Sequence, residues 1–298
     1  QYEVCNWVLS FDDPQDFCLA CGLNRIIPDL SDLKYRQRWH KIELAKHRLV
    51  YSLLRWQLPL ENKVQNPTQG LAFDFKADPN CPNEAKVMTG HDNGLITLNI
   101  AEADDVERVM ARDQMNEVYR SLLGHFRHEI GHYYWDILVD GTAFLQPCRA
   151  LFGDERIDYQ AALDRHYQHG PATDWMLAYI SPYASMHPWE DWAETWAHYL
   201  HIVDVLETAD AFGIQIRPPV VQDQHKHMMT LATPLKPYTT QEFDDIYQAW
   251  LPVAFAMNSL NRSMGQDDFY PFVINSQVQN KLRFIHEVIQ HYAKEKYQ

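Results

Sequence analysis

The residues with the clearest chemical potential are His128 and His132, four positions apart, with Glu129 directly after the first histidine. On a helix, residues four apart lie one turn apart on the same face, so both imidazoles can reach one metal ion. A carboxylate beside the first histidine can accept a proton from a water molecule that the metal activates. The His-Glu-x-x-His pattern therefore predicts a zinc site with Glu129 as the general base. The alternative is a helix whose two histidines are merely packed or solvated.

A zinc ion bound by two histidines needs a third ligand from the protein, and the candidates here are acidic. Glu190 and Glu194 lie four positions apart in a tryptophan-rich segment with a helical pattern. One of them could bind the metal while the other holds the free ring nitrogen of a ligand histidine. Asp136 stands in the same relation to His132 and is a further candidate for that supporting role. The alternative is an amphipathic core helix with two solvated glutamates.

A second acidic cluster follows the histidine motif, with Asp154 and Glu155 beside Arg156 and near Asp158. We expect these residues to form a buried salt-bridge network that supports the site. Glu155 is the alternative third ligand if Glu190 does not bind the metal.

Three further histidines lie near these candidates in the sequence. His125 precedes His128 by one helical turn and could face the metal, but we expect it to pack the helix at the floor of the cleft. We expect the same packing role for His198 and His201.

Three of the five cysteines, Cys5, Cys18 and Cys21, gather near the start of the sequence. Their spacing is typical of a zinc knuckle, although a structural zinc ion needs four ligands. We expect a structural zinc site, with free thiols as the alternative. A redox role is not favoured, because the strand-helix-strand context of thioredoxin-like motifs is missing. An odd number of cysteines argues against a disulfide scaffold and predicts a reducing, cytoplasmic location.

The elements that must position these residues are mostly helical by their apolar periodicity of 3.6 residues. Ser31 is predicted to cap the first long helix, a capping box at Thr239 and Glu242 to open a later one, and Ser276 to cap the last. The histidine motif lies inside the best-defined helix. The predicted helices cover 31–56, 116–138, 189–206, 239–260 and 276–298.

Between residues 70 and 100 the pattern is extended, and short strands are predicted over 71–75 and 95–100. Asn93-Gly94, directly before the second strand, is a strong turn signal. The stretch 213–238 contains four prolines and is predicted to be a long surface excursion, for which we hypothesise the role of a lid. The fold class that follows is α+β, mainly helical, with a small β region.

The composition of the 298 residues excludes several classes of protein. Hydrophobic residues make up 46% and aromatic residues 13%, which excludes intrinsic disorder. The charge balance of 26 − 40 = −14 disfavours nucleic acid and anionic membrane surfaces as partners. No apolar run approaches the ~20 residues that a membrane span needs. No signal-like segment is visible, and because the first residue is Gln1 we expect further sequence before it.

The spacing between the histidine motif and the Glu-x-x-Ala-Glu segment resembles that of the gluzincin metallopeptidases, particularly the lethal-factor type. More closely, the sequence is similar to bacterial zinc-binding metallopeptidases with an N-terminal zinc ribbon. The matching stretches are Cys5-Asn6-Trp7, Ile27-Pro28-Asp29-Leu30, Gly124-His125-Phe126-Arg127-His128-Glu129, Gly153-Asp154-Glu155-Arg156 and His187-Pro188-Trp189-Glu190-Asp191-Trp192.

The resemblance implies a short, truncated zinc-ribbon-like segment over 1–30 and a zincin-like metallopeptidase domain over 31–298. It implies Glu190 as the third zinc ligand and Tyr183, seven positions earlier, as a contact to the substrate carbonyl. Members of the family carry a further cysteine just before the Cys5 position. The fourth ligand of the cysteine site is therefore expected upstream of this sequence, or from Asp13 or Cys81.

The expected function is zinc-dependent hydrolysis of peptide bonds in a peptide or protein substrate. Glu129 would act as the base, Tyr183 would stabilise the developing oxyanion, and Glu194 would orient a ligand histidine. The strand over 95–100, as the edge strand of the cleft, would pair with an extended substrate. One alternative is a metal-binding but catalytically weak or inactive homologue that acts as a peptide-binding or protein-binding module. A further alternative is a hydrolase of non-peptide amides.

Overall fold

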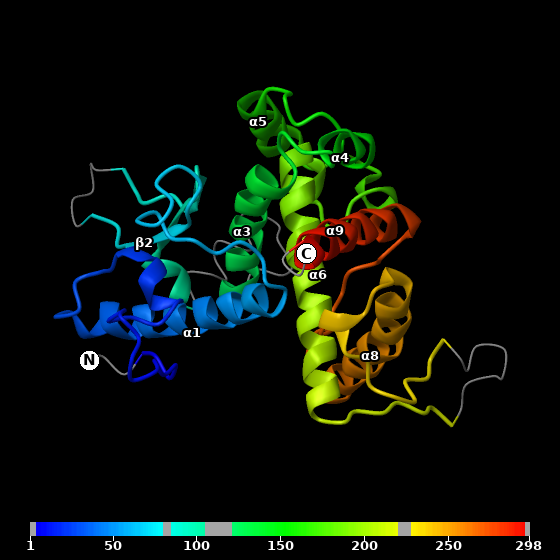
Figure 1. Ribbon diagram of the computed structural model, residues 1–298. Coiled ribbons are helices and arrows are strands. Elements are labelled where there is room, and N and C mark those ends of the chain that lie inside the picture. Colours follow the sequence, from blue (N-terminus) through cyan, green and yellow to red (C-terminus); the bar gives the residue numbers. More distant parts are fainter. Residues whose placement is uncertain (1–3, 80–84, 105–120, 220–227, 296–298) are drawn as a thin grey trace. The chain divides into compact units, whose positions relative to one another are not determined.

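The computed structural model describes residues 4–79, 85–104, 121–219 and 228–295 (Figure 1). Helices dominate the described residues and a four-stranded sheet accompanies them, which confirms the predicted mainly helical α+β class. The chain forms two compact units, residues 1–147 and 148–298. None of the helices in the described ranges combines the length and apolar character that crossing a membrane requires.

In the first unit, the long helix α1 (Leu33–Arg55) begins close to the predicted position but with a different cap. The Asp32 carboxylate accepts hydrogen bonds from the backbone amides of Lys34 and Tyr35, which satisfies two of the unpaired amides of the first turn. The predicted cap, Ser31, instead donates its hydroxyl to Asp29. The apolar stripe of the helix is buried as its periodicity predicts.

The sheet of the first unit has the order β1-β2-β4-β3. Strands β1 and β2 and strands β2 and β4 pair in parallel, whereas β3 and β4 form an antiparallel hairpin. The strand bounds are Asn24–Ile26 for β1, Ala72–Lys76 for β2, Gly90–Asp92 for β3 and Leu95–Asn99 for β4. Strand β4 lies between β2 and β3, so the prediction of an edge strand over 95–100 is wrong. Within the described sheet, β3 is the edge strand on that side.

The hairpin turn between β3 and β4 is the predicted Asn93-Gly94 pair, with φ angles of 48° and 78°. Positive φ at both central residues is what a two-residue hairpin turn requires. A Cβ on Gly94 would lie 2.4 Å from the backbone oxygen of Gly70, so only glycine fits here.

Helix α3 (Leu122–Leu138) carries the histidine motif and begins at Ser121, whose hydroxyl accepts from the amide of Gly124. The predicted start of this helix at residue 116 lies outside the described residues. Helix α3 packs on α1 and on β3. Its Phe126 ring contacts Phe73 and Phe75 of β2, which fixes the helix against the sheet. After β4, the 3-10 helix η2 (Ile100–Ala103) is capped by Asn99.

The second unit is built around α6 (Pro188–Ala211), against which α8 and α9 pack (Figure 1). The His187 ring accepts from the amide of Trp189, and Pro188 occupies the first helical position, where a missing amide costs nothing. The remaining α-helices are α4 (Leu145–Phe152), α5 (Tyr159–His169), α8 (Phe243–Ser263) and α9 (Ser276–Glu295), and the 3-10 helices are η3 (Trp175–Leu177), η4 (Tyr183–Ser185) and η5 (Pro237–Thr239). The first residues of α4 precede the division between the units.

Two predicted caps of the second unit differ in the structure. Thr239 ends η5, and Glu242 precedes α8 without a side-chain cap bond, so the capping box is not formed. Helix α9 begins at Ser276, but the side chain that accepts from the amide of Val278 is that of Asn275. An asparagine one position earlier performs the same role as the predicted serine.

The predicted excursion over 213–238 lies partly outside the described residues, which omit 220–227. In its described part, Ile216 and Leu231 exchange two backbone hydrogen bonds of 3.0 Å. This bridge ties the two ends of the segment together, and the hypothesis of a lid stays a prediction.

Candidate metal sites

Helix α3 brings the two histidines of the motif together. The Nε2 atoms of His128 and His132 lie 3.1 Å apart, and the two ring planes are nearly perpendicular. Two imidazole nitrogens bound to one tetrahedral zinc ion at its usual bond length would be about 3.3 Å apart. The two rings therefore already have the separation that a shared zinc ion requires.

Glu129 is held by a histidine and a glutamate that precede the motif. His125 Nε2 lies 3.1 Å from Glu129 Oε1, and His125 Nδ1 lies 2.5 Å from Glu102 Oε2. Burial alone would lower the pKa of His125, but the two carboxylates raise it to about 9. Burial alone would raise the pKa of Glu129, but its hydrogen bond to His125 and the charge of that ring hold it below its ordinary value. Glu129 is thus an ionised carboxylate, as a general base must be.

This arrangement revises the expectation for His125, which does more than pack the helix floor. Glu102 was not predicted, because it lies 23 residues before His125 and only the fold after β4 brings the two together. Its sequence signal is its position three residues after the helix-capping Asn99, which is a feature of ordinary helix starts as well.

A further histidine near α3 was not predicted. His91 on β3 stacks on the His132 ring, with centroids 6.3 Å apart, and its Nε2 accepts from the amide of Gly94 at 2.8 Å. Burial and the neighbouring His132 lower the pKa of His91 to about 4, so its ring is neutral. The structure places the Asp136 carboxylate 3.8 Å from His91 Nε2. The predicted support of His132 by Asp136 stays a prediction.

The second unit holds Glu190 in the first turn of α6, where it is buried and its Oε1 accepts a hydrogen bond of 2.9 Å from the Tyr159 hydroxyl. The positive end of a helix dipole favours a carboxylate at this place. Tyr159 is a functional candidate that sequence reasoning missed, because it opens α5, a helix that was not predicted. Burial, Glu190 and Tyr159 together raise the pKa of Tyr183 well above its usual range, so Tyr183 keeps its proton.

The other acidic candidates of the second unit have partners of their own. Glu194 accepts a hydrogen bond of 2.7 Å from the Ser181 hydroxyl. Glu155 forms a forked pair with Arg149, and Asp154 forms one with Arg156.

The structure thus confirms the predicted ion pairs at Asp154-Glu155-Arg156, but the network is not buried as predicted. The Asp154 and Arg156 side chains are 44% and 68% exposed. Asp158 takes no part in it and caps α5 instead. His198 and His201 are buried in α6, as their predicted packing role requires.

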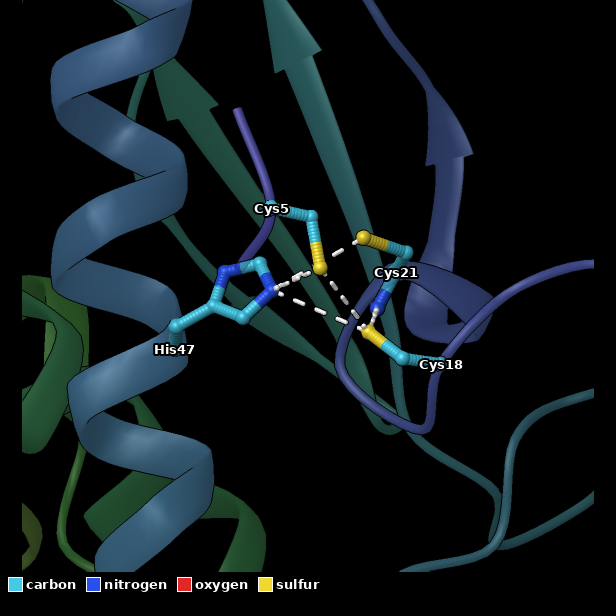
Figure 2. A group of neighbouring side chains, drawn as sticks. All are labelled: Cys5, Cys18, Cys21 and His47. Atoms are coloured by element: carbon cyan, nitrogen blue, oxygen red, sulfur yellow. Dashed lines mark hydrogen bonds between the residues drawn. The ribbon is translucent and has the colours of Figure 1, made fainter. Parts of the chain in front are cut away.

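The three cysteines of the cluster gather with a fourth residue that could hold a metal, and all four lie in the first unit (Figure 2). The thiols of Cys5, Cys18 and Cys21 converge on Nε2 of His47, which projects from α1. Of the predicted fourth ligands, a cysteine upstream of this sequence stays a prediction. The Asp13 carboxylate accepts from the amide of Gln15 within its own turn, and Cys81 lies outside the described residues.

Sequence reasoning missed His47 because it follows Cys21 by 26 residues and lies in the middle of a long helix. A histidine at such a position has no local spacing that distinguishes it from a packing residue. The signal that could have found it is the unfilled fourth position itself, since histidine and cysteine are the usual ligands of structural zinc.

The fold and these two groups define a mainly helical α+β protein with a His-Glu-x-x-His helix and a separate cluster of three cysteines and a histidine. Residues 35–288 match the family described as "Putative zinc-binding metallo-peptidase", and residues 1–32 match a zinc-ribbon domain. The chain belongs to this zinc-binding metallopeptidase family.

Relatives of the chain occur in mycobacteria. Uncharacterized proteins of Mycobacterium bovis and Mycobacterium tuberculosis are each 42% identical to it over 290 residues, which cover 97% of this chain and 80% of the relative. No solved structure shows a significant match to the chain.

Proposed function

We propose that the protein is a zinc-dependent peptidase in which His128, His132 and Glu190 hold the metal and Glu129 is the general base. The observation that carries this proposal is the pair of facing Nε2 atoms 3.1 Å apart, beside an ionised and buried carboxylate. The membership of the chain in a zinc-binding metallopeptidase family supports the same conclusion.

When bound, zinc would supply Lewis acidity toward a water molecule and the scissile carbonyl. The protein residues would perform the proton transfers. Glu129 would accept a proton from the attacking water and deliver it to the leaving amine. His125, fixed by Glu102, would hold Glu129 in one orientation. Tyr183, which stays protonated, would donate a hydrogen bond to the developing oxyanion.

Within the second unit, the surroundings of Glu190 suit a third metal ligand better than those of Glu155 do. Its carboxylate is buried at a helix N-terminus and oriented by Tyr159, as metal-binding carboxylates usually are oriented by a hydrogen-bond donor. The carboxylate of Glu155 is instead occupied by the guanidinium of Arg149. We assign Glu194 and Asp136 the supporting roles that the sequence suggested, each toward a ligand histidine.

The substrate we propose is an extended peptide that pairs with β3. This strand is the edge of the described sheet next to α3, and its His91 stacks on His132. An edge strand has unpaired backbone groups, with which an extended peptide can form an additional strand. β3 thereby takes the role that the sequence had suggested for the strand over 95–100.

The test is Glu129→Gln in the full chain, assayed by mass spectrometry on a library of unmodified peptides. Gln keeps the shape of the side chain but cannot accept the proton, so we expect turnover to fall by about 10²–10⁴-fold while the zinc content stays unchanged. His128→Asn should lose both metal and turnover. Glu287→Gln, an exposed position on α9, is the matched control and should change neither.

Each opposite result has a defined meaning. Full activity in Glu129→Gln would refute Glu129 as the base. A zinc-loaded wild-type protein that binds peptides but cleaves none would support the inactive binding module. Cleavage of small amides without cleavage of peptides would favour the hydrolase of non-peptide amides.

A further inference from the structure

The orientation of Glu129 depends on a series of hydrogen bonds that begins outside helix α3. Thr89, which lies directly before β3, donates its hydroxyl to Glu102 Oε1. Glu102 Oε2 lies 2.5 Å from His125 Nδ1, and His125 Nε2 lies 3.1 Å from Glu129 Oε1. The series thus joins Thr89 to the proposed general base through two intermediate side chains.

A second contact fixes the direction of the Thr89 hydroxyl. The backbone amide of Asn99 donates to Thr89 Oγ1 at 3.1 Å, so the hydroxyl oxygen already accepts one hydrogen bond. Its own hydrogen points to the carboxylate of Glu102, which only accepts hydrogen bonds when it is ionised. A side chain at position 89 therefore needs a hydroxyl to join the amide to the carboxylate. Serine has such a group, whereas valine has the shape of threonine without it.

Asn99 also builds the surroundings of this hydroxyl. Its side-chain amide donates to Asp78 Oδ1 at 2.8 Å, and its Oδ1 accepts from the amide of Ala101 at 3.0 Å. The second of these bonds caps η2, the 3-10 helix that carries Glu102. Asn99 thus contacts Thr89 with its backbone and places the partner of Thr89 with its side chain.

The intermediate members of the series are each held on two sides. The Glu102 carboxylate has a different partner at each oxygen, and the His125 ring faces a carboxylate at each nitrogen. The side chains of Glu102, His125 and Glu129 are 15%, 14% and 7% exposed, so little water competes for these bonds. Loss of one hydrogen bond is costly for a largely buried group. A change at Thr89 should therefore affect the last member of the series.

We propose that Thr89 is a positioning residue of the candidate active site: through Glu102 and His125, its hydroxyl holds Glu129 in the orientation that proton transfer requires. This inference rests on the proposed function, in which Glu129 is the base and β3 pairs with the substrate. The same hydrogen bonds join that strand to the base, because Thr89 directly precedes β3. Small displacements of catalytic groups cost large factors in rate, so a base needs support of this kind. The alternative is that Thr89 merely closes the open end of the β3–β4 hairpin.

The first experiment examines the hydrogen bonds without using turnover. In the full chain, the proton on His125 Nδ1 should give a downfield NMR signal that exchanges slowly with water, because Glu102 holds it. Its absence in His125→Gln assigns the signal. Thr89→Val removes the hydroxyl, so we expect this proton to exchange about 10-fold faster, the equivalent of one ordinary hydrogen bond. Thr89→Ser keeps the hydroxyl and should show the wild-type rate.

The second experiment measures kcat and KM on a peptide that the wild-type protein cleaves. A misplaced base affects the transition state alone, so Thr89→Val should lower kcat by about 10-fold at unchanged KM and zinc content. Thr89→Ser should restore kcat. Loss of hairpin closure alone would instead raise KM at unchanged kcat, because β3 would bind the peptide less well, and this result would overturn the proposal. Thr97→Val, on β4 opposite Gly90, is the matched control and should change neither constant.

Equal exchange rates of the His125 proton in Thr89→Val and wild type would also overturn the proposal. If Thr89→Val fails to fold, the wild-type signal decides: exchange as fast as that of an exposed imidazole would show that the series does not hold His125. A wild-type protein that cleaves no peptide would contradict the peptidase proposal instead. The exchange rates would then still confirm or overturn the role of Thr89 in holding the series, because they do not depend on turnover.

Discussion

Glu129 lies between a protonated histidine and the two motif histidines, and its pKa depends on both neighbours. The hydrogen bond and charge of His125 are the principal effects that keep this carboxyl ionised against its burial. His125 in turn owes its proton to Glu102 and Glu129. The ionisation of one proposed catalytic residue is thus set by two residues outside the proposed set of metal ligands.

This chain of contacts predicts how the pH dependence of turnover changes when it is broken. His125→Gln removes the positive charge, so the pKa of Glu129 rises and the acid limb of kcat/KM should move upward by about one pH unit or more. Zinc content should stay at the wild-type value. Glu102→Gln should act in the same direction but less strongly, because the neutral amide that replaces the carboxylate can still orient His125. An acid limb that does not move in either variant would contradict the role of His125 as a positioning residue.

At this scale the sequence predicts what depends on local spacing and misses what depends on the fold. His128, Glu129 and His132 follow from the geometry of one helical turn. Glu102 and His47 meet their partners only across 23 and 26 residues of chain, and the sequence does not specify how the chain folds over such a separation. Residues of ordinary type at such distances carry no local pattern to distinguish them.

Among the elements, helix α6 combines deep burial with many polar side chains. Asp191 forms a buried ion pair of 2.6 Å with Lys281 of α9, and His198 Nδ1 lies 2.9 Å from the Tyr270 hydroxyl. Because α6 is surrounded by α8, α9 and η4, each buried polar group of the helix must find its partner within the protein. A helix of this kind makes the stability of its unit sensitive to protonation.

His198 determines the direction in which the stability of this unit changes with pH. Burial lowers its pKa to about 4, below the ordinary value of 6.5, so the folded ring is neutral while the unfolded ring takes up a proton as the pH falls below 6.5. This contribution to stability is full above pH 6.5 and is lost toward pH 4. Between pH 7 and pH 5 it amounts to about 2 kcal/mol.

We therefore expect His198→Gln to reduce the loss of unfolding free energy between pH 7 and pH 5 by about this amount. Urea unfolding followed by tryptophan fluorescence at the two pH values measures it. His40→Gln, a less buried histidine on α1, should retain the wild-type dependence. An identical pH dependence in His198→Gln and wild type would show that another group is responsible.

The elements themselves were predicted well where the apolar period is long and poorly where the contact is tertiary. The apolar stripe predicts α1, and alternation with a turn signal predicts β2 and β4. Strand β1 was missed because its three residues show no alternation of apolar and polar side chains. Its Arg25 instead forms a forked ion pair with the buried Asp74 of β2, which joins the two strands. The position of β4 inside the sheet was missed because strand order depends on which strands pair, and the sequence of one strand does not specify its neighbours.

At the scale of the whole molecule, the cysteine cluster belongs to the first unit, whereas the second unit has a hydrophobic core of its own. The four residues of the cluster, Cys5, Cys18, Cys21 and His47, all lie in residues 1–147. The second unit has its own core, in which large rings such as Trp192, Trp196 and Trp250 are fully buried. Zinc bound to the cluster should therefore stabilise the N-terminal segment without changing the helices around α6.

Zinc removal tests this division directly by hydrogen exchange in a variant with His128→Asn and His132→Asn, which removes the two motif histidines. At a free zinc concentration 100 times the dissociation constant, binding stabilises the folded segment by about 2.7 kcal/mol, or about 100-fold in the exchange rate of amides that open with it. A chelator should therefore accelerate exchange over residues 4–26 and leave α8 and α9 unchanged. Added Zn²⁺ should restore protection, whereas Mg²⁺ should not, because thiolates do not select it. If the chelator has no effect on residues 4–26, the Arg25–Asp74 pair and the hydrogen bonds of Lys46 to Glu43 and Asn24 hold this segment without a metal. Accelerated exchange in both units would instead mean that the cluster supports the fold of the entire chain.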